Sequence, residues 1–293
     1  MTNRNRGAYA LTAFAVALTV TACGGTKAGA GASHTPKSAS GGTGSSAPAS
    51  APVGLHNSGT LAVCIDPEYP PLEYVQNGKT VGFDADGARA LGDYWGVKTT
   101  LVNTAFQGLV PALKAKRCDV MWSGLYISPD RLKVADAAGV LKTGPGLIIN
   151  AAETGQIKTK ADLAGKTVAV QAGGTNEKII RALSDELKKA GKMPITVQAY
   201  PQTAPTVAAV TGGKADALIE TDVALPGIVK KSNGKLVVVP NIFNTSTVFG
   251  VFTDKGSPVS AATKTAITAL LKNGKLASIA KTYGLDPAKL ATN

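Results

Sequence analysis

The chain has 293 residues, 44% of them hydrophobic, and its 31 basic and 19 acidic side chains give a formal net charge of +12. This length accommodates two modest hydrophobic cores once the segments that cannot fold are set aside. The two histidines, His34 and His56, fall in or beside a low-complexity segment. The composition therefore argues against a Ser-His-Asp triad, a Cys-His pair or a His-ligated metal, and we expect no cofactor.

The positive charge does not predict a nucleic-acid partner. Four basic residues precede residue 55, and residues 55–293, which hold all 19 acids, keep a net charge of +8. Their lysines occur singly or in pairs such as Lys188-Lys189, without a basic run or interleaved aromatics. This pattern indicates a solvated surface.

Residues 1–22 have the layout of an export signal: two arginines, an apolar run too short to span a bilayer stably, and small residues before Cys23. The sequence Val20-Thr21-Ala22-Cys23 resembles the lipobox of bacterial lipoproteins. That resemblance implies that Cys23 becomes the lipidated first residue of the mature chain. The alternative is a signal peptide with an incidental cysteine.

Residues 23–54 consist mainly of Gly, Ala, Ser, Thr and Pro. Such a segment buries too little apolar surface to fold, so we expect a flexible tether. With a lipid at its start, the tether would hold a folded domain at the outer face of the cytoplasmic membrane.

From Gly59 onward the pattern alternates strands and helices, which predicts α/β architecture with mostly parallel sheets covered by helices on both faces. We expect two lobes, one from residues 55–147 and 248–293 and the other from 148–247. The expected strands are 61–65, 97–102, 118–122, 167–171, 195–199, 215–219, 236–239 and 248–253, with a short extended piece at 80–83. The expected helices are 84–94, capped by Asp84, then 107–116, 176–189, 206–210, 222–231, one from 258 after Ser257, and 275–283.

Arg131 is the central candidate residue. The apolar run 120–122 ends in Ser and Gly, as a parallel strand does where it delivers its carboxyl end to a site. Ser128 and Pro129 then predict a helix start, where a cation gains nothing from the helix dipole. Arg131 in that first turn therefore either grips a ligand carboxylate with its planar fork or pairs with a nearby aspartate on a solvated face.

Two cysteines remain in the folded part. Cys64 lies near the end of one predicted strand and Cys118 at the start of another. Parallel neighbours of that kind would hold the two residues too far apart to bond, so we expect no disulfide between them, although the exported context permits one.

Several motifs together give the chain a family likeness. From Gly59 to Leu285 it resembles the extracellular solute-binding proteins of polar-amino-acid ABC importers, which have the two-lobed type 2 periplasmic binding fold. The matching pieces are Tyr69-Pro70-Pro71-Leu72-Glu73-Tyr74, Gly82-Phe83-Asp84-Ala85-Asp86, Leu109-Val110-Pro111-Ala112-Leu113, Asp119, Ser123 to Arg131, Gly173-Gly174-Thr175, Lys214-Ala215-Asp216-Ala217, Asn273-Gly274-Lys275-Leu276 and Tyr283-Gly284.

The resemblance implies a set of ligand contacts. Arg131 would grip the ligand's α-carboxylate, Tyr69 and Phe106 would sandwich its side chain, and Asp66 would lie at the mouth of the pocket. The Gly173-Gly174-Thr175 loop precedes a helix, so its amides and the Thr175 hydroxyl would share the carboxylate from the opposite lobe. The alternatives are an ordinary strand-to-helix turn for this loop, including Gly174, and core packing for the two aromatics.

The chain departs from the family at three positions. Two of them, Gly124 and Tyr126, are close to Ser123, and the third, Thr221, is in the expected second lobe. Tyr126 stands where the family has Ser or Thr, which implies a smaller or differently shaped pocket, and Gly124 offers only its backbone. Thr221 stands where the family has an Asp that neutralises the ligand's α-ammonium. A one-residue slip would restore a carboxylate through Asp222.

The predicted function is capture of a small polar amino acid, or a closely related amino compound, for an ABC importer. The protein would bind its ligand as a lipid-anchored monomer, partner the permease subunits, and not be an enzyme. One alternative is a cyclohexadienyl-dehydratase-like enzyme on the same fold, with Glu220 and Asp222 as proton donors. Another is a sensor subunit that presents ligand to a receptor.

Overall fold

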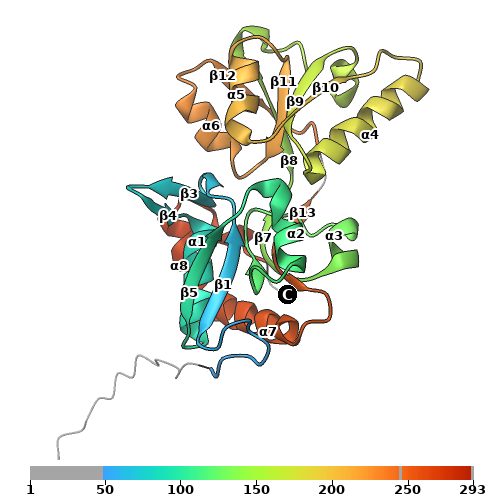
Figure 1. The fold of residues 1–293 in the computed structure, drawn as a ribbon. Coiled ribbons are helices and arrows are strands. Elements are labelled where there is room, and N and C mark those ends of the chain that lie inside the picture. Colours follow the sequence, from blue (N-terminus) through green and yellow to red (C-terminus); the bar gives the residue numbers. More distant parts are fainter. Residues whose placement is uncertain (1–48, 244–245, 292–293) are drawn as a thin grey trace, which may run out of the picture. The chain divides into compact units, whose positions relative to one another are not determined.

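The computed structural model describes residues 49–243 and 246–291. The predicted signal segment, the lipidation site Cys23 and nearly all of the tether lie outside the described residues. Two five-stranded sheets and one three-stranded sheet form the framework (Figure 1). No helix in the described part of the chain is long and apolar enough to cross a membrane.

The first five-stranded sheet has the strand order β5-β1-β6-β13-β7. Strand β1 runs parallel to its neighbours β5 and β6, while β13 is antiparallel to both β6 and β7. The bounds are β5 (Lys98–Asn103), β1 (Thr60–Ile65), β6 (Val120–Met121), β13 (Thr247–Asp254) and β7 (Ala135–Thr143).

The second sheet has the order β10-β9-β11-β8-β12. Here β9 is parallel to β10 and β11, and β8 is antiparallel to β11 and β12. The bounds are β10 (Thr196–Tyr200), β9 (Thr167–Gln171), β11 (Ala217–Thr221), β8 (Pro145–Asn150) and β12 (Leu236–Val239). A small antiparallel sheet consists of β2 (Glu68–Tyr69), β3 (Glu73–Gln76) and β4 (Lys79–Val81).

Helices cover both faces of each large sheet, as the sequence pattern predicts. The first sheet packs against α1 (Phe83–Tyr94), α7 (Pro258–Lys272) and α8 (Lys275–Thr282) on one face and α2 (Leu109–Lys114) on the other. The second packs against α4 (Thr175–Lys189) on one face and α5 (Thr203–Thr211) and α6 (Leu225–Lys231) on the other. A further short helix, α3 (Pro129–Val134), carries Arg131, and 3-10 turns occupy Phe106–Gly108, Ala151–Glu153, Lys160–Leu163 and Pro287–Lys289.

The chain passes from the first sheet to the second at Gly144, between β7 and β8. This crossing comes earlier than the lobe boundary expected at residue 147. The chain returns to the first sheet between the end of β12 at Val239 and the start of β13 at Thr247. The nine-residue strand β7 was not predicted from the sequence; its Ala-Asp-Ala-Ala-Gly start lacks the branched and aromatic residues that mark strands.

The two serine caps are confirmed, and the aspartate cap is wrong. The hydroxyl oxygens of Ser128 and Ser257 accept hydrogen bonds from the first turns of α3 and α7, each with proline at its start. The residue before α1 is Gly82, at φ 121°, where a Cβ would lie 2.2 Å from a carbonyl oxygen of Leu72. Because Gly82 occupies the cap position, Asp84 lies inside the first turn and turns its carboxylate into the interior.

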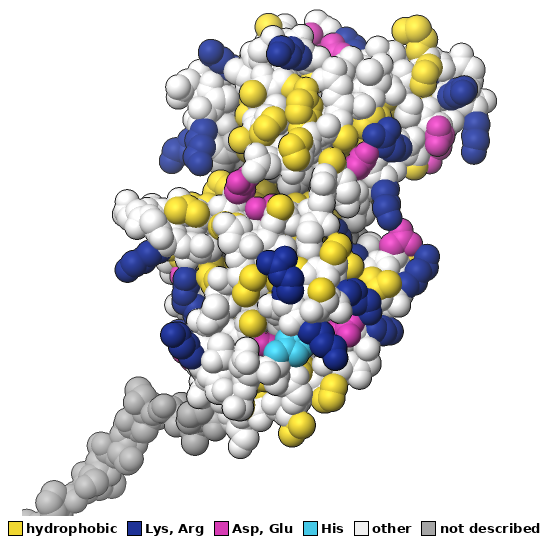
Figure 2. All heavy atoms as spheres, in the orientation of Figure 1, with side chains coloured by type: hydrophobic (Ala, Val, Ile, Leu, Met, Phe, Trp, Pro, Cys, Tyr) yellow, Lys and Arg dark blue, Asp and Glu magenta, His cyan; other side chains and the backbone are white. Residues whose placement is uncertain are grey.

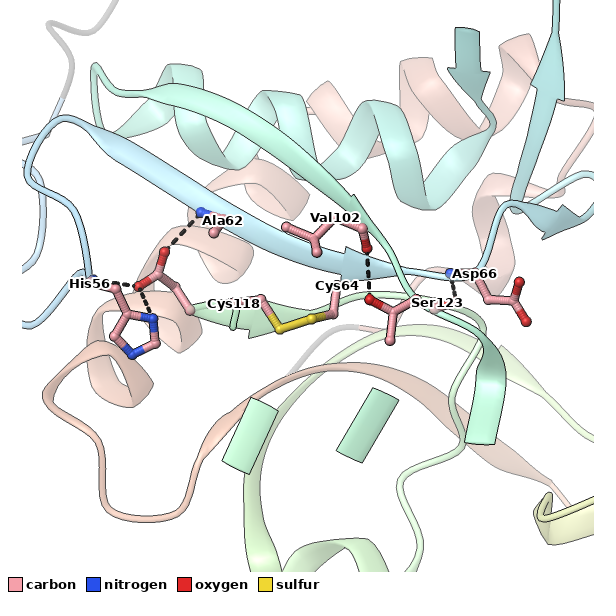
Figure 3. The surroundings of a disulfide bond; sticks show 9 residues. His56, Ala62, Cys64, Asp66, Val102, Cys118 and Ser123 are labelled. Atoms are coloured by element: carbon pink, nitrogen blue, oxygen red, sulfur yellow. Dashed lines mark hydrogen bonds and ion pairs between the residues drawn. A yellow bond between two sulfur atoms is a disulfide. The ribbon is translucent and has the colours of Figure 1, made fainter. Parts of the chain in front are cut away.

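Cys64 and Cys118 form a disulfide, so the prediction of two separate thiols is wrong (Figure 3). The error lies in where the strand begins. The strand β6 starts only at Val120, so Cys118 lies in the segment before it and is not held at the spacing of two parallel strands. The two Cα atoms are 5.6 Å apart, within the range that a disulfide spans.

The surface supports the interpretation of the charge pattern. On the face shown in Figure 2, the Lys and Arg side chains are scattered singly or in small groups and do not form one continuous basic patch.

Candidate ligand-binding site

A cavity lies where loops at the ends of strands from both large sheets meet. Ten of the eleven residues predicted as ligand contacts line it. One wall comes from the first sheet, the adjoining small sheet and their loops: Asp66, Glu68, Tyr69, Glu73, Phe106, Ser123, Gly124, Tyr126 and Arg131. The other comes from the second sheet and its loops: Gln171, Gly174, Thr175, Asn176, Thr203, Ile219, Glu220 and Thr221.

Arg131 reaches the cavity from the first turn of α3. Its Nη1 donates to the backbone oxygen of Tyr126 at 2.8 Å and to Oγ1 of Thr175, on the opposite side of the cavity, at 3.3 Å. No ion pair joins Arg131 to a carboxylate of residues 49–243 or 246–291. Desolvation lowers the pKa of Arg131 to about 10, so the group stays cationic at neutral pH with donors to spare.

Thr175 begins the 15-residue helix α4, and Gly174 stands before it without a side-chain cap. The first amides of α4 therefore face the cavity region with no capping oxygen, as in anion sites at helix N-termini. The Phe106 ring lies close to the Gly174 backbone, since a Cβ at Gly174 would be 3.6 Å from it. Arg131, Thr175 and the start of α4 together form a cationic end of the cavity.

A buried acidic side chain, Glu220, lies near the end of β11. Glu220 is 4% exposed, and its Oε1 accepts from the Tyr69 hydroxyl at 2.6 Å and from the Thr221 amide at 2.7 Å. Its Oε2 accepts from Thr203 Oγ1 at 3.3 Å. Burial raises the pKa of Glu220, while the bonds from Tyr69, Thr221 and Thr203 oppose that rise.

Tyr69 connects the two walls of the cavity. Besides donating to Glu220, its hydroxyl shares a 2.5 Å hydrogen bond with Oγ1 of Thr221. The ring of Tyr69 lies against Gly124, at φ 52°, where a Cβ would come within 3.0 Å of it. Gly124 therefore gives this ring its place, and its amide donates to Asp84.

The wall from the first sheet rests on a polar network. The Ser123 hydroxyl accepts from the Asp66 amide at 2.9 Å and donates to Oε1 of Glu73 at 2.8 Å. Asp66 Oδ2 accepts from the Phe106 amide at 3.0 Å. Burial, with repulsion from Glu68 as a second cause, raises the pKa of Asp66 to about 6.

Glu73, which also lines the cavity, and Asp84 lie deep in this wall, each 1% exposed. Asp84 Oδ2 accepts from the Gly124 amide at 2.6 Å, and the second oxygen of each carboxyl has no protein hydrogen-bond partner. Burial and the charge of Asp84 raise the pKa of Glu73 well above its usual range, and burial raises that of Asp84 to about 7. At neutral pH the pair therefore retains a proton.

Tyr126 is the residue from which the sequence predicted a smaller or differently shaped pocket. Its ring stacks on Phe249, with ring centroids 5.2 Å apart and planes 14° from parallel. Its hydroxyl and Oδ1 of Asn176 are both buried, belong to cavity-lining residues and have no protein partner. Buried polar groups normally have a hydrogen-bond partner, so these two atoms are candidate contacts for a ligand.

Asp222 does not line the cavity. Its carboxylate accepts from Thr143 Oγ1 at 2.6 Å and from the Gly144 amide at 3.3 Å, and it pairs with Lys289 Nζ at 2.8 Å. It therefore lies at the crossing between the two sheets. Thr221, in contrast, lies in the cavity.

One histidine belongs to the folded part after all. His56 donates its backbone amide to Asp119 at 2.7 Å, and its Nδ1 lies 3.3 Å from the same carboxylate (Figure 3). This contact lies outside the cavity lining.

The sequence assigns no ligand-binding role to Asn176 or Glu73, and it names Glu220 as a residue beside Thr221 and as a proton donor in the enzyme alternative. Two of the three stand next to a predicted residue: Asn176 follows Thr175, and Glu220 precedes Thr221. Residues next to each other in a regular strand point to opposite faces. At the end of β11 both Glu220 and Thr221 reach the same cavity.

Comparisons with known proteins identify the fold and the kind of protein. A family model described as bacterial extracellular solute-binding proteins, family 3, matches residues 61–286. The chain is 30% identical over 235 residues to the L-cystine-binding protein TcyJ of Escherichia coli (strain K12), covering 79% of this chain and 85% of that protein.

Two solved structures are also similar. An ancestral arginine-binding protein bound to arginine matches at a TM-score of 0.70 and 28% identity, covering 78% of this chain and 99% of that one. An ancestral amino acid-binding protein, a precursor of cyclohexadienyl dehydratase, matches at a TM-score of 0.69 and 27% identity, covering 77% and 95%. The predicted α/β fold of two sheet-based lobes is confirmed, and the matched family consists of binding proteins.

Proposed function

We propose, since this chain belongs to the bacterial extracellular solute-binding proteins of family 3, that it captures a small polar amino acid or a closely related amino compound for an ABC importer. The named relatives are amino acid-binding proteins, which supports this role. The ligand-binding residues would be Arg131, Tyr69, Phe106, Ser123, Gly124, Tyr126, Gly174, Thr175, Asp66 and Thr221.

The observation that carries the proposal is the cationic end of the cavity. Arg131 has no carboxylate partner in the described part of the chain, and Thr175 and the start of α4 face it from the other sheet. A ligand carboxylate would satisfy the free donors of Arg131 and the helix amides together. Neither wall can complete that site alone.

Ligand binding would therefore favour the state in which the two walls are close. A carboxylate held by Arg131 on one side and by α4 on the other gives differential affinity for the closed arrangement, which shifts the population toward it. Micromolar affinity corresponds to about −8 kcal/mol, a free energy within reach of a charged fork, a helix start and aromatic contacts.

The partner would be the permease of the importer, approached by a monomer held at the membrane. Cys23 would carry the lipid, and residues 23–54 would give the folded part freedom to move. A Cys23→Ser variant expressed in a bacterium should leave the membrane fraction and appear in the medium or periplasm. Recovery of that variant in the membrane fraction would contradict the anchor and leave the binding role untouched.

A thermal-shift screen of the purified folded part tests the binding role. The panel comprises the twenty standard L-amino acids and L-cystine, because a ligand that binds only the folded state raises Tm by mass action. Arg131→Ala should abolish the shift with every carboxylate ligand that stabilises the parent protein. Arg181→Ala is the matched control: it removes an arginine of α4 that pairs with Glu177 outside the cavity, and it should keep the shift.

Enzymatic activity is the second candidate, favoured by the buried Glu220 in the cavity and by the likeness to a dehydratase precursor. A carboxyl whose pKa is raised can donate a proton to a leaving hydroxyl. Incubation with prephenate and with arogenate, followed by detection of the aromatic product, separates the two functions. We expect no turnover; product formation that Glu220→Gln abolishes would establish an enzyme instead.

A further inference from the structure

We propose that the groove between helices α5 and α6 is the surface with which this protein docks on its permease, and that it receives an acidic segment with apolar side chains. The groove has a volume of about 430 Å³ and adjoins the ligand cavity, with which it shares Glu68, Tyr69 and Thr203. The proposal rests on the proposed function, because it takes a permease as the partner. It adds where the contact lies and which charge the partner carries.

The α5 side of the groove is uncharged. None of the nine residues of α5 carries a charge, although Ala204 is exposed and Val207 is only half-buried. The solvent-facing side of a surface helix normally carries charged or polar side chains. Ile228 of α6 adds a half-buried apolar side chain across the groove, and Figure 2 shows hydrophobic side chains gathered over α5. The floor of the groove therefore suits apolar side chains of a partner.

Positive charge bounds the groove on the α6 side. Lys231, the last residue of α6, and Lys235, just before β12, both line the groove and are exposed. Neither lysine pairs with a carboxylate of residues 49–243 or 246–291. The third charged residue of the lining, Glu68, comes from the opposite wall. A partner with an acidic side chain against α6 would therefore complement the groove, and Glu68 disfavours a second acid at the opposite wall.

Both walls of the ligand cavity contribute to the groove. Glu68, Tyr69 and Pro70 belong to the wall from the first sheet, and α5 and α6 belong to the second sheet. A partner that fills the groove contacts both walls, so it binds best when the walls are close. Tyr69 also lines the cavity, where its hydroxyl bonds to Glu220. The shape of the groove therefore depends on the same contacts that a ligand in the cavity would alter.

Two other hollows fit a docking partner less well. The hollow on the far side of the cavity, beside Phe106, has one lysine, Lys178, and that lysine already pairs with Asp130. A smaller hollow beside the exposed Val238 of β12 is lined by residues of the second sheet and its loops alone. Only the α5–α6 groove among these three combines both walls with lysines that have no acidic partner in the described part of the chain.

Uptake and ligand affinity together test the groove. Ala204→Arg places a bulky cation in the groove from an exposed position, and Lys231→Glu/Lys235→Glu reverses its charge. The cells are ones that make this protein, with their own copy replaced by each variant. Uptake of the radiolabelled amino acid that binds most tightly in the screen should fall at least about tenfold, because the groove then repels or excludes its partner. Calorimetry should give a Kd for that amino acid within about threefold of the parent value.

Lys188→Glu/Lys189→Glu is the matched control. It makes the same change of charge at exposed positions of α4, on the other face of the second sheet, and should keep the uptake rate. Unchanged uptake in both groove variants would overturn the proposal. Equal loss of uptake in the control, or a loss that weaker amino acid binding explains, would overturn it as well.

Photocross-linking identifies the occupant without relying on uptake. A photoreactive p-benzoylphenylalanine at position 204 should link in intact cells to a permease peptide that contains Asp or Glu, and the same group at position 188 should not. A link from position 204 to a second copy of this chain, or to no permease peptide, would overturn the proposal. If the link to the permease forms and the parent protein binds no amino acid, the proposed function is wrong and the docking surface stands.

Discussion

The two walls of the cavity are built on different principles. The wall from the first sheet bonds to itself: Ser123 joins Asp66 to Glu73, and the Gly124 amide bonds to Asp84. The wall from the second sheet bonds across the cavity, with Glu220 and Thr221 both held by Tyr69 of the opposite side. This hydrogen-bond network of the first wall thus needs no partner from the other wall. In the second wall, Glu220 and Thr221 depend on a partner from the opposite side, Tyr69.

The buried carboxyl groups show the same difference. Glu73 and Asp84 lie together deep in the first wall, so one proton can serve both. Glu220 stands alone on the second wall and accepts from neutral groups. Glu73 and Asp84 can share one proton, whereas the charge of Glu220 has to be neutralised by a proton of its own or by a ligand. We therefore expect changes in the buried Glu73–Asp84 pair of the first wall to alter stability and changes at Glu220 in the second wall to alter affinity.

The largest effect on the first wall should come from its disulfide. Cys64 lies shortly before Asp66 in the sequence, and Cys118 lies shortly before Ser123. The bond therefore ties together the two segments of the chain that carry the network (Figure 3). It closes a loop with a sequence separation of 54, for which the chain-entropy model gives roughly 4 kcal/mol of stability. A Cys64→Ser/Cys118→Ser variant should lose about that much in urea unfolding.

The control is the parent protein with dithiothreitol, which should match the double variant. Equal stability of parent and variant would show that the strands are fixed without the disulfide and that the first wall does not depend on it.

This disulfide marks the limit of what the sequence could predict about the fold. The order of strands and helices follows from hydrophobic runs, glycines and proline-serine helix starts, all of them local signals. Whether Cys64 meets Cys118 depends on where β6 begins and on the path of the chain before it, which are set by packing between distant segments. In the same way, Asp84 has the local signature of a cap, and a tertiary contact between Gly82 and Leu72 assigns it another place.

The next largest effect concerns pH. Because the folded pKa of Asp84 is about 7 and its ordinary value is 3.8, the folded state keeps a proton that the unfolded chain has lost between these values. Stability should therefore fall as pH rises through this range, by a few kcal/mol for this carboxyl. Asp66, with a folded pKa of about 6, and Glu73 act in the same direction.

Asp84→Asn should flatten this dependence, as measured by urea unfolding of the ligand-free protein between about pH 4 and pH 8. Asp185→Asn, on an exposed face of α4, is the control and should follow the parent. If the Asp84→Asn variant kept the full parental slope, the proton would belong to some other group. The contrast between the Glu73–Asp84 pair and Glu220 would then be lost.

A smaller effect is expected at Tyr126. Its hydroxyl is buried without a protein partner, while its ring is held by Phe249. Tyr126→Phe keeps the ring and removes the hydroxyl, so it should weaken ligand binding by about tenfold and leave the ligand-free Tm unchanged or slightly higher. Calorimetry and thermal unfolding measure the two quantities. Unchanged affinity would mean that the ligand does not use this hydroxyl.

The sequence predicted the site better than it predicted how the site is balanced. Arg131, Tyr69 and Phe106 were predicted because the family resemblance assigns each of them a place in the pocket. Glu220 received no ligand-binding role from the sequence, and both it and its neighbour Thr221 line the cavity at the end of β11, where the alternation of a regular strand does not separate them. Its partners Tyr69 and Thr203 are distant in sequence, so the chain alone gave no sign of the bonds that define it.

The smallest effect should come from the rim of the cavity, where Lys178 of α4 pairs with Asp130 of α3 at 2.5 Å. Together Lys178 and Lys133 lower the pKa of Asp130 to about 2. All three side chains are exposed, and exposed ion pairs are screened by salt. Lys178→Ala should therefore change ligand affinity by less than about fivefold, and only at low ionic strength.

Lys133→Ala is the matched control, since it removes an equal charge from the same aspartate within α3 and breaks no contact between the walls. Titrations of both variants at low and high salt should differ slightly at low salt and coincide at high salt. If Lys178→Ala weakened binding far more than Lys133→Ala in high salt, an exposed pair would be holding the walls together. The buried groups Arg131 and Glu220 would then no longer account for ligand-dependent closure.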